Sequence, residues 1–189
     1  MSSVVLSGDT SGSVTLTVPS AAGSNTATVP AQTGTLQMLG QGTAVSASGT
    51  SVDFTGIPSW VKRITVMFQG VSTSGTSAIQ VQLGDSGGIE NTGYLSSSST
   101  AGGTVTAITS GFAICTPAAT SVVSGHCVLT LIDAANTWVQ TSLVKSATNT
   151  MAYSAGDKAT STTLDRVRIT TVNGTDTFDA GSVNILYEG

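Results

Sequence analysis

Apolar and β-branched residues alternate with serine and threonine in short runs along most of the chain. Between residues 60 and 71 one side of an extended backbone would carry the larger apolar residues, namely Trp60, Ile64, Val66 and Phe68. A period of two is that of a strand with one buried face, and no stretch of useful length shows helical periodicity. Glycine or proline ends many of these runs, as expected for strands joined by turns. The pattern predicts an all-β protein.

The N-terminal part offers a much smaller apolar face than the rest of the chain. It contains two threonine-rich runs that each end in Val-Pro, and residues 40–51 are small and polar, as in a neck. So short a β-segment needs copies of itself or a partner to become stable. About eight strands are expected over residues 52–189. We therefore expect an attachment or shaft segment over residues 1–45, followed by an antiparallel, jelly-roll-like β-sandwich knob over residues 46–189.

Composition and charge exclude several classes of function. The 189 residues include 6 basic and 10 acidic ones, with a net charge of −4 and a mean hydropathy of +0.27, which does not fit a solvated coil. The basic residues are scattered, so we expect no nucleic-acid partner. Apolar runs are too short for membrane insertion, and the first residues do not resemble a secretory signal. A single histidine disfavours a histidine-based metal site, and no cofactor is expected.

The chain has two cysteines, Cys115 and Cys127, without the spacing of a metal or redox motif. If residues 116–126 form a hairpin loop, the two thiols would face each other across neighbouring strands. In a reducing compartment, free and buried thiols are favoured over a disulfide.

Residues 84–88 read Gly-Asp-Ser-Gly-Gly, the pattern that surrounds the nucleophile of trypsin-like serine proteases. Hydrolysis would require Ser86 to be activated by a histidine base, which a carboxylate orients. The only histidine, His126, follows the serine by forty residues, which is the reverse of the order in that family. Glycine and aspartate also favour a tight turn between two strands. We expect a turn, and no catalytic residues.

Carboxylates and aromatic side chains in the loops are the candidates for binding a ligand. Asp85 and Glu90 flank the same turn, and Asp176 and Asp179 lie in another. Paired carboxylates serve glycosidases, and such loops can bind calcium, but acids in turns ordinarily cap backbone amides. The charged pairs at 157–158 and 165–168 suit surface or subunit ion pairs.

Aromatic rings are the usual platforms for sugars. Trp60 is expected in the core. Tyr94 precedes the low-complexity residues 96–103, which are expected to form a mobile, exposed loop. The predicted glycan-binding residues are Asp85, Glu90, Tyr94 and Trp138, and no metal ligands are predicted.

Several segments resemble fibre proteins of tailed bacteriophages. The resemblance covers both ends of the chain and much of its middle: residues 6–19, 23–30, 32–35, 52–64, 81–89 and 178–188. It implies a homotrimer with an N-terminal attachment or shaft region and a C-terminal β-sandwich knob that faces the host. It also implies assembly in the host cytoplasm and exposure on the mature virion.

The brevity of the chain favours a short tail fibre or a head fibre, without enzymatic activity. Its expected partners are two further copies of itself, another virion protein at the N-terminal segment, and a host surface glycan. A capsid decoration protein that binds no receptor remains the alternative. A serine hydrolase using Ser86, or a bacterial carbohydrate-binding module, is a more remote one.

Overall fold

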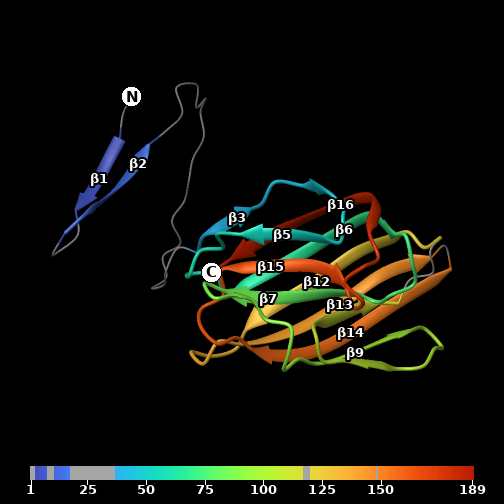
Figure 1. Ribbon diagram of the computed structural model, residues 1–189. Helices are drawn as coiled ribbons and strands as arrows, with labels where there is room; N and C mark the ends of the chain where they lie inside the picture. The colour runs from blue at the N-terminus through green and yellow to red at the C-terminus, as the bar shows by residue number, and fades with distance from the viewer. Residues whose placement is uncertain (1–2, 8–10, 18–36, 117–119, 148) are drawn as a thin grey trace. The chain divides into compact units, whose positions relative to one another are not determined.

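The computed structural model describes residues 3–7, 11–17, 37–116, 120–147 and 149–189 (Figure 1). These residues form β-strands, turns and irregular segments, and none of them is helical. The chain divides into two compact units, Met1–Leu36 and Gln37–Gly189. The prediction of an all-β protein is confirmed.

The N-terminal unit contains one two-stranded antiparallel ribbon. Strand β1 (Ser3–Ser7) pairs with β2 (Ser13–Thr17) in a register that runs from Ser3 opposite Thr17 to Ser7 opposite Ser13. Val5 and Leu6 are more than half exposed, because the ribbon has no second layer among the described residues of this unit. The run expected to form a strand at residues 25–30 lies outside the described residues.

The larger unit is a sandwich of two antiparallel sheets. One has nine strands, and the order of its main path is β10 (Thr106–Ile108), β9 (Leu95–Thr100), β14 (Thr150–Ala159), β13 (Thr137–Ala147), β12 (Val123–Leu131), β6 (Arg63–Thr73), β16 (Phe178–Glu188) and β3 (Leu39–Gln41), with β4 (Val45–Ser46) also on β16. The other has five, in the order β11 (Phe112–Cys115), β7 (Ile79–Asp85), β15 (Arg166–Thr171) and β5 (Ser51–Thr55), with β8 (Gly88–Ile89) on β7.

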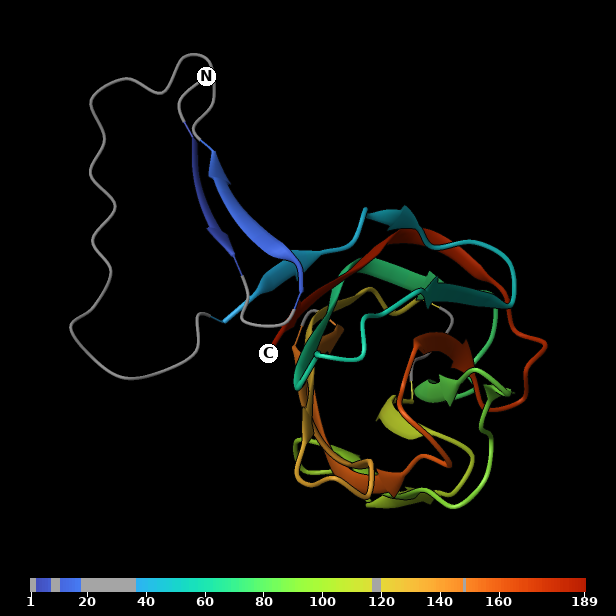
Figure 2. The same cartoon turned by 90° about the vertical axis from the view of Figure 1, so that its left-hand side faces the viewer.

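The nine-stranded sheet curves around the five-stranded one, as the view along the strands shows (Figure 2). Inward side chains of both sheets are removed from water, among them Ile64, Leu129, Ile79 and Ile169, each 0% exposed. Every second residue of β6 is buried over most of its length, which matches the alternation predicted from the sequence. Trp60 is only partly buried, with its ring centre 5.8 Å from that of Tyr187.

β9 and β14 of the larger sheet were not expected from the sequence. Residues predicted as a mobile loop form β9, and β14 beside it has small residues at most of its inward positions, namely Ala152, Ser154 and Gly156. Ser96 and Ser154 point inward and satisfy their polar atoms there: the amide of Ala113 donates to Ser96 Oγ (2.9 Å), and Gln140 Nε2 donates to Ser154 Oγ (2.9 Å). The prediction of a mobile loop at 96–103 is therefore wrong for residues 96–100.

The segment expected to form a neck belongs to the sandwich. Residues 39–41 and 45–46 pair with β16, so the larger unit begins near residue 37 rather than at 46. Just before β3, the amide of Met38 donates to the carbonyl of Gly189 (2.9 Å). We call this end of the sandwich, with residues 38 and 189, the entry end. The opposite end, where the loops 74–78 and 172–177 meet, is the far end; there the amide of Ser74 donates to the carbonyl of Thr177 (2.8 Å).

The two cysteines are free and buried, as predicted, but they do not flank a hairpin. Cys115 ends β11 of the five-stranded sheet and Cys127 lies in β12 of the other sheet. Burial raises the pKa of each thiol to about 12. Both thiols are therefore protonated at neutral pH.

Candidate functional site

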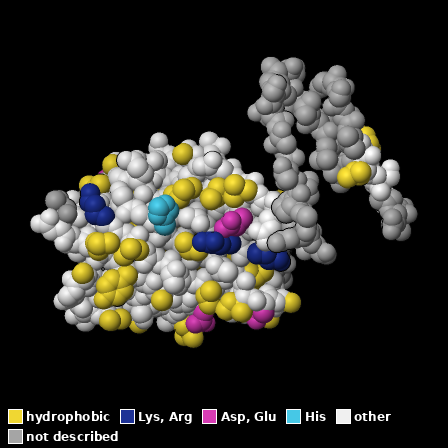
Figure 3. Space-filling model, turned by 180° about the vertical axis from the view of Figure 1, so that it is seen from behind, with side chains coloured by type: hydrophobic (Ala, Val, Ile, Leu, Met, Phe, Trp, Pro, Cys, Tyr) yellow, Lys and Arg dark blue, Asp and Glu magenta, His cyan; other side chains and the backbone are white. Residues whose placement is uncertain are grey.

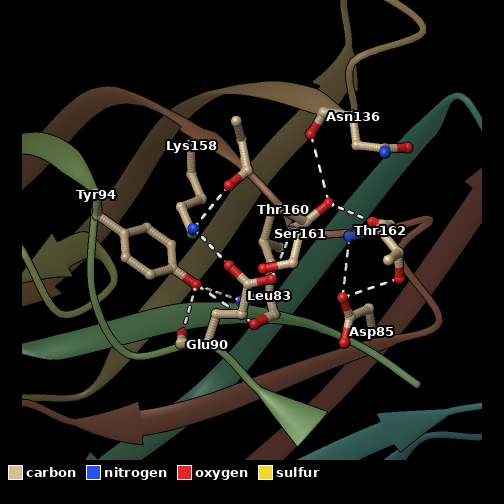
Figure 4. Close-up of polar contacts among 10 residues, drawn as sticks. Leu83, Asp85, Glu90, Tyr94, Asn136, Lys158, Thr160, Ser161 and Thr162 are labelled. Carbon is tan, nitrogen blue, oxygen red and sulfur yellow. Dashed lines mark hydrogen bonds and ion pairs between the residues drawn. The ribbon is translucent and has the colours of Figure 1, made fainter. Parts of the chain in front are cut away.

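Three of the four predicted binding residues meet in a polar network at the entry end, and the fourth lies beside it (Figure 4). The network begins at the turn after β7. Asp85 ends β7, and its Oδ1 accepts a hydrogen bond from the amide of Gly87 (2.8 Å). Gly88 and Ile89 then return as β8, opposite Asp85 and Gly84. The prediction that Gly84–Gly88 is a strand connection closed by its aspartate is confirmed.

The second oxygen of Asp85 holds the loop that follows β14. Oδ2 accepts hydrogen bonds from the amide (3.0 Å) and the hydroxyl (2.9 Å) of Thr162. The amide of Gly87 and the Thr162 hydroxyl lower the pKa of Asp85 the most, and the charge of Arg166 adds a smaller effect. Both carboxylate oxygens are thus engaged inside the protein.

Glu90 forms the central ion pair of the network. Its Oε2 lies 2.5 Å from Nζ of Lys158, and its Oε1 accepts a hydrogen bond from the amide of Ser161 (2.6 Å). The side chains of Lys158 and Glu90 are only 9% and 17% exposed. Burial by itself would raise the pKa of Glu90, but Lys158 and Ser161 outweigh it, so the pKa is lowered.

Lys158 is a residue that sequence reasoning placed wrongly. The pair of Asp157 and Lys158 was expected to form surface or subunit ion pairs, but successive residues of a strand face opposite sides. Asp157 is exposed, whereas Lys158 points inward, where Nζ also donates to the carbonyl of Ala159 (2.6 Å) and lies 5.5 Å from the centre of the Tyr94 ring. Ala152, Ser154 and Gly156 alternate on the inward face of β14, and continuing this alternation by two residues would have placed Lys158 inward.

Tyr94 is enclosed by this network rather than open to a ligand. It is 0% exposed, and its ring lies edge-on to Phe112 with the ring centres 5.0 Å apart. Its hydroxyl accepts from the amide of Leu83 (2.7 Å) and donates to the carbonyl of Glu90 (2.9 Å). Burial raises the pKa of the hydroxyl above its usual range. Tyr94 therefore fixes the β8–β9 connection in place.

Trp138 is the cross-strand partner of Lys158 and is 2% exposed. Its indole Nε1 is buried and has no hydrogen-bond partner among the described residues. The prediction that Tyr94 and Trp138 present ring faces to a sugar is wrong in this structure, because neighbouring residues cover both rings. Large aromatic side chains bury much apolar area, and here both rings contribute that area to the core.

A pocket of about 510 Å³ lies next to Trp138 at the entry end. Exposed Lys62 and Asp133 contribute to its walls, as do buried Leu164 and half-buried Asn136. Asn136 has a φ of 60°, a left-handed conformation that asparagine tolerates better than most residues. Its carbonyl accepts a hydrogen bond from the amide of Thr160 (3.1 Å), which links this loop to the polar network.

Ser86 and His126 do not form a catalytic pair. Ser86 is exposed in the turn between β7 and β8 of the five-stranded sheet. His126 is exposed on the outside of the nine-stranded sheet, with Leu143 and Met67 as its cross-strand neighbours. The imidazole thus points away from the sheet that carries the serine. The geometry offers no support for a hydrolase at this turn.

No protein-family model, curated protein or solved structure matches the chain. Within the described ranges, no group of three or more histidine, cysteine or acidic side chains is placed to hold a metal ion. Among the same residues no helix is able to cross a membrane. The network at the entry end is best described as a clamp that joins the connections after β7 and β14.

Proposed function

We propose that the chain is a non-enzymatic structural protein of a phage virion. In this proposal it forms a homotrimeric short fibre, in which residues 1–36 dock on the particle and the sandwich contacts the host surface. The observation that carries the proposal is the division into two unequal units, a slender ribbon and a sandwich with its own core. The resemblance of several segments to phage fibre proteins supports it.

The ribbon of β1 and β2 supports a role in attachment. Two strands joined by five residue pairs are at best marginally stable in water by themselves. Val5 and Leu6, both 56% exposed, would remain in contact with water in an isolated chain. Copies of the same ribbon, or a protein of the particle, would provide the missing apolar layer.

The position of residue 38 gives the sandwich a direction in this proposal. In this proposal the far end, opposite residue 38, is the end of the sandwich that contacts the host. Asp85, Glu90, Tyr94 and Trp138 would then lie on the side toward the particle. This moves the proposed contact with a glycan away from the residues predicted from the sequence.

The far end offers hydrogen-bonding groups in fixed positions. Oδ2 of Asp176 accepts a hydrogen bond from the amide of Ser77 (2.9 Å), and its Oδ1 accepts one from Nδ2 of Asn173 (2.7 Å). Asn173 and Thr175 are exposed beside them. Amide, hydroxyl and carboxylate groups of this kind recognise sugar hydroxyls.

The test is binding of the purified protein to a glycan array and to host cells, after its absolute mass has been measured by light scattering. Thr175→Trp places a bulky side chain on the far end, and Ala134→Trp is the matched control at the entry end, since both residues are exposed. We expect Thr175→Trp to abolish binding and Ala134→Trp to leave it unchanged. Loss of binding with Ala134→Trp alone would reverse the proposed direction. A trimer that binds neither glycans nor cells and is found on purified heads would favour a capsid decoration protein.

A further inference from the structure

The outside of the nine-stranded sheet carries an uncharged surface that is unusual for a water-exposed sheet. We call this surface the outer face. Pairing of β14, β13, β12, β6 and β16 arranges its residues in rows across the strands. Two adjacent rows contain no lysine, arginine, aspartate or glutamate; they consist of Tyr153, Leu143, His126, Met67 and Asn184, and of Ala155, Thr141, Val128, Thr65 and Leu186.

Several of these residues are apolar and open to water. Leu143 and Tyr153, which are direct cross-strand partners, are 55% and 51% exposed, and Met151 next to them is 50% exposed. Figure 3 shows this side of the molecule, with hydrophobic side chains spread around the only histidine and few charges between them. Tyrosine and methionine with few charges are typical of the centre of a protein–protein interface.

The charged residues of the outer face lie toward its two ends. Lys145 is exposed toward the far end of β13. The row nearest the entry end contains Asp157 on β14, Arg63 three strands away on β6, and Glu188 beside Arg63 on β16. The carboxylate of Asp157 forms no ion pair or hydrogen bond with any residue that the structure describes, whereas the guanidinium of Arg63 lies 3.2 Å from the carboxylate of Glu188 and its side chain is 52% exposed.

We propose that the outer face packs against further copies of this chain around a three-fold axis, with Asp157 of one copy paired to Arg63 of the next. The proposal rests on the proposed trimeric fibre and identifies the surface through which the sandwiches associate. Other proteins of the particle, and residues 1–36 of the same chain, are the competing occupants of this face.

The direction of the strands explains why these two residues are brought together. In this proposal the three-fold axis runs along the strands. Rotation about such an axis keeps each row at the same level in every copy. The side of the face formed by β14 then meets the side of the next copy formed by β6 and β16. Asp157 approaches Arg63 in one row, and Tyr153 approaches Met67 two rows further on.

Charge complementarity favours a copy of the chain as the occupant. Within one molecule Asp157 and Arg63 are separated by β13 and β12, which places them roughly 14 Å apart at the usual spacing of strands. They are therefore too far apart for an ion pair within one sandwich. A neighbouring copy supplies a basic partner to the side chain of Asp157, while the two adjacent uncharged rows avoid repulsion between identical faces.

Covalent capture tests the proposed contact directly. The double variant Asp157→Cys with Arg63→Cys cannot close a disulfide within one chain, because the two positions are too far apart. After mild oxidation of the double variant we expect covalent trimers on a non-reducing gel. Each single variant should give no trimers and at most traces of dimers. The native cysteines are buried, so they should not contribute. A double variant that stays monomeric on the gel while light scattering still reports a trimer would overturn the proposed face and leave the trimeric fibre intact.

A second set of variants measures assembly without cross-linking. Leu143→Lys should raise the concentration needed for half-assembly at least tenfold, because it places a charge in the uncharged rows. Ile132→Lys, which changes an equally exposed residue in the loop between β12 and β13, is the matched control and should have no effect. Asp157→Arg should weaken assembly, and addition of Arg63→Asp should restore it.

Each outcome of these assembly measurements tests one part of the proposal. If Leu143→Lys assembles like the unmodified chain, the outer face is not the interface. If the double charge reversal is no better than Asp157→Arg alone, the pairing of Asp157 with Arg63 is wrong. An unmodified chain that is monomeric at all concentrations would instead contradict the trimeric fibre itself.

Discussion

Lys158 and Glu90 form an ion pair of 2.5 Å between β14 and the β8–β9 connection, although the two residues are 68 positions apart in the sequence. Replacing Glu90 with glutamine would leave the ammonium of Lys158 largely buried without its counter-charge. We expect Glu90→Gln to lower the free energy of unfolding by about 3 kcal/mol, as measured by urea denaturation. The double variant Glu90→Gln with Lys158→Met should lose less than the sum of the single changes. Additive losses would mean that the pair is not coupled.

The same network predicts how stability depends on pH. Asp85 and Glu90 both have a lowered pKa in the folded protein, whereas in the unfolded chain they return to ordinary values of 3.8 and 4.5. Their contribution to stability is therefore complete above the unfolded values and is lost as the pH falls through the folded ones. We expect the denaturation midpoint to fall as the pH drops below about 4.5, and to fall less in Glu90→Gln. Equal slopes in both proteins would show that Glu90 contributes nothing.

The buried cysteines should be inert until the sandwich opens. Since the thiolate is the reactive form, a pKa of about 12 leaves Cys115 and Cys127 unreactive at neutral pH. We expect no reaction with a thiol reagent in the native protein and two reacted thiols per chain in denaturant. Rapid labelling of one thiol under native conditions would place that residue at the surface.

Two glycines should differ sharply in their tolerance of alanine. Gly181 has a φ of +87°, and a Cβ there would lie 2.4 Å from the backbone of Gly70 on β6. Gly174 has a φ of +66° but open space around it. Gly181→Ala should cost about 3 kcal/mol or prevent folding, whereas Gly174→Ala should cost about 1 kcal/mol. Thermal denaturation of the two variants provides the comparison, and similar melting temperatures would contradict the close approach of β16 to β6.

Ser86 should behave as an ordinary serine. With His126 on the opposite sheet, nothing in the described structure is placed to remove its proton, so a fluorophosphonate probe should leave the native chain unlabelled. Labelling that disappears in Ser86→Ala would establish a nucleophile and contradict the proposed structural role.

Strands with large inward residues were the ones that the sequence predicted well. Ile64, Val66 and Phe68 mark β6 because their alternation is visible in single residues. β9 and β14 were missed because serine, alanine and glycine occupy most of their inward positions, and these residues are as common in loops. Their burial depends on hydrogen bonds such as that between Gln140 and Ser154, which join residues of different strands. No local pattern contains that information.

The candidate site shows the same limit. The turn at Gly84–Gly88 was predictable because aspartate and glycine determine it locally. The role of Asp85 and Glu90 was not, since their partners Thr162, Ser161 and Lys158 come from a loop and strand about seventy residues later. Exposed carboxylates and enclosed ones look alike in a sequence.

The pairing of β3 with the C-terminal strand also determines how the sandwich bears a mechanical load. Residue 37 precedes β3, whose hydrogen bonds to β16 run across the strands between residues 39–41 and 186–188. A pull on residue 37 along the strands therefore loads these bonds in shear, all at the same time. A sideways pull would break them one after another. The sandwich is thus built to resist tension along its long direction and to yield most easily to peeling.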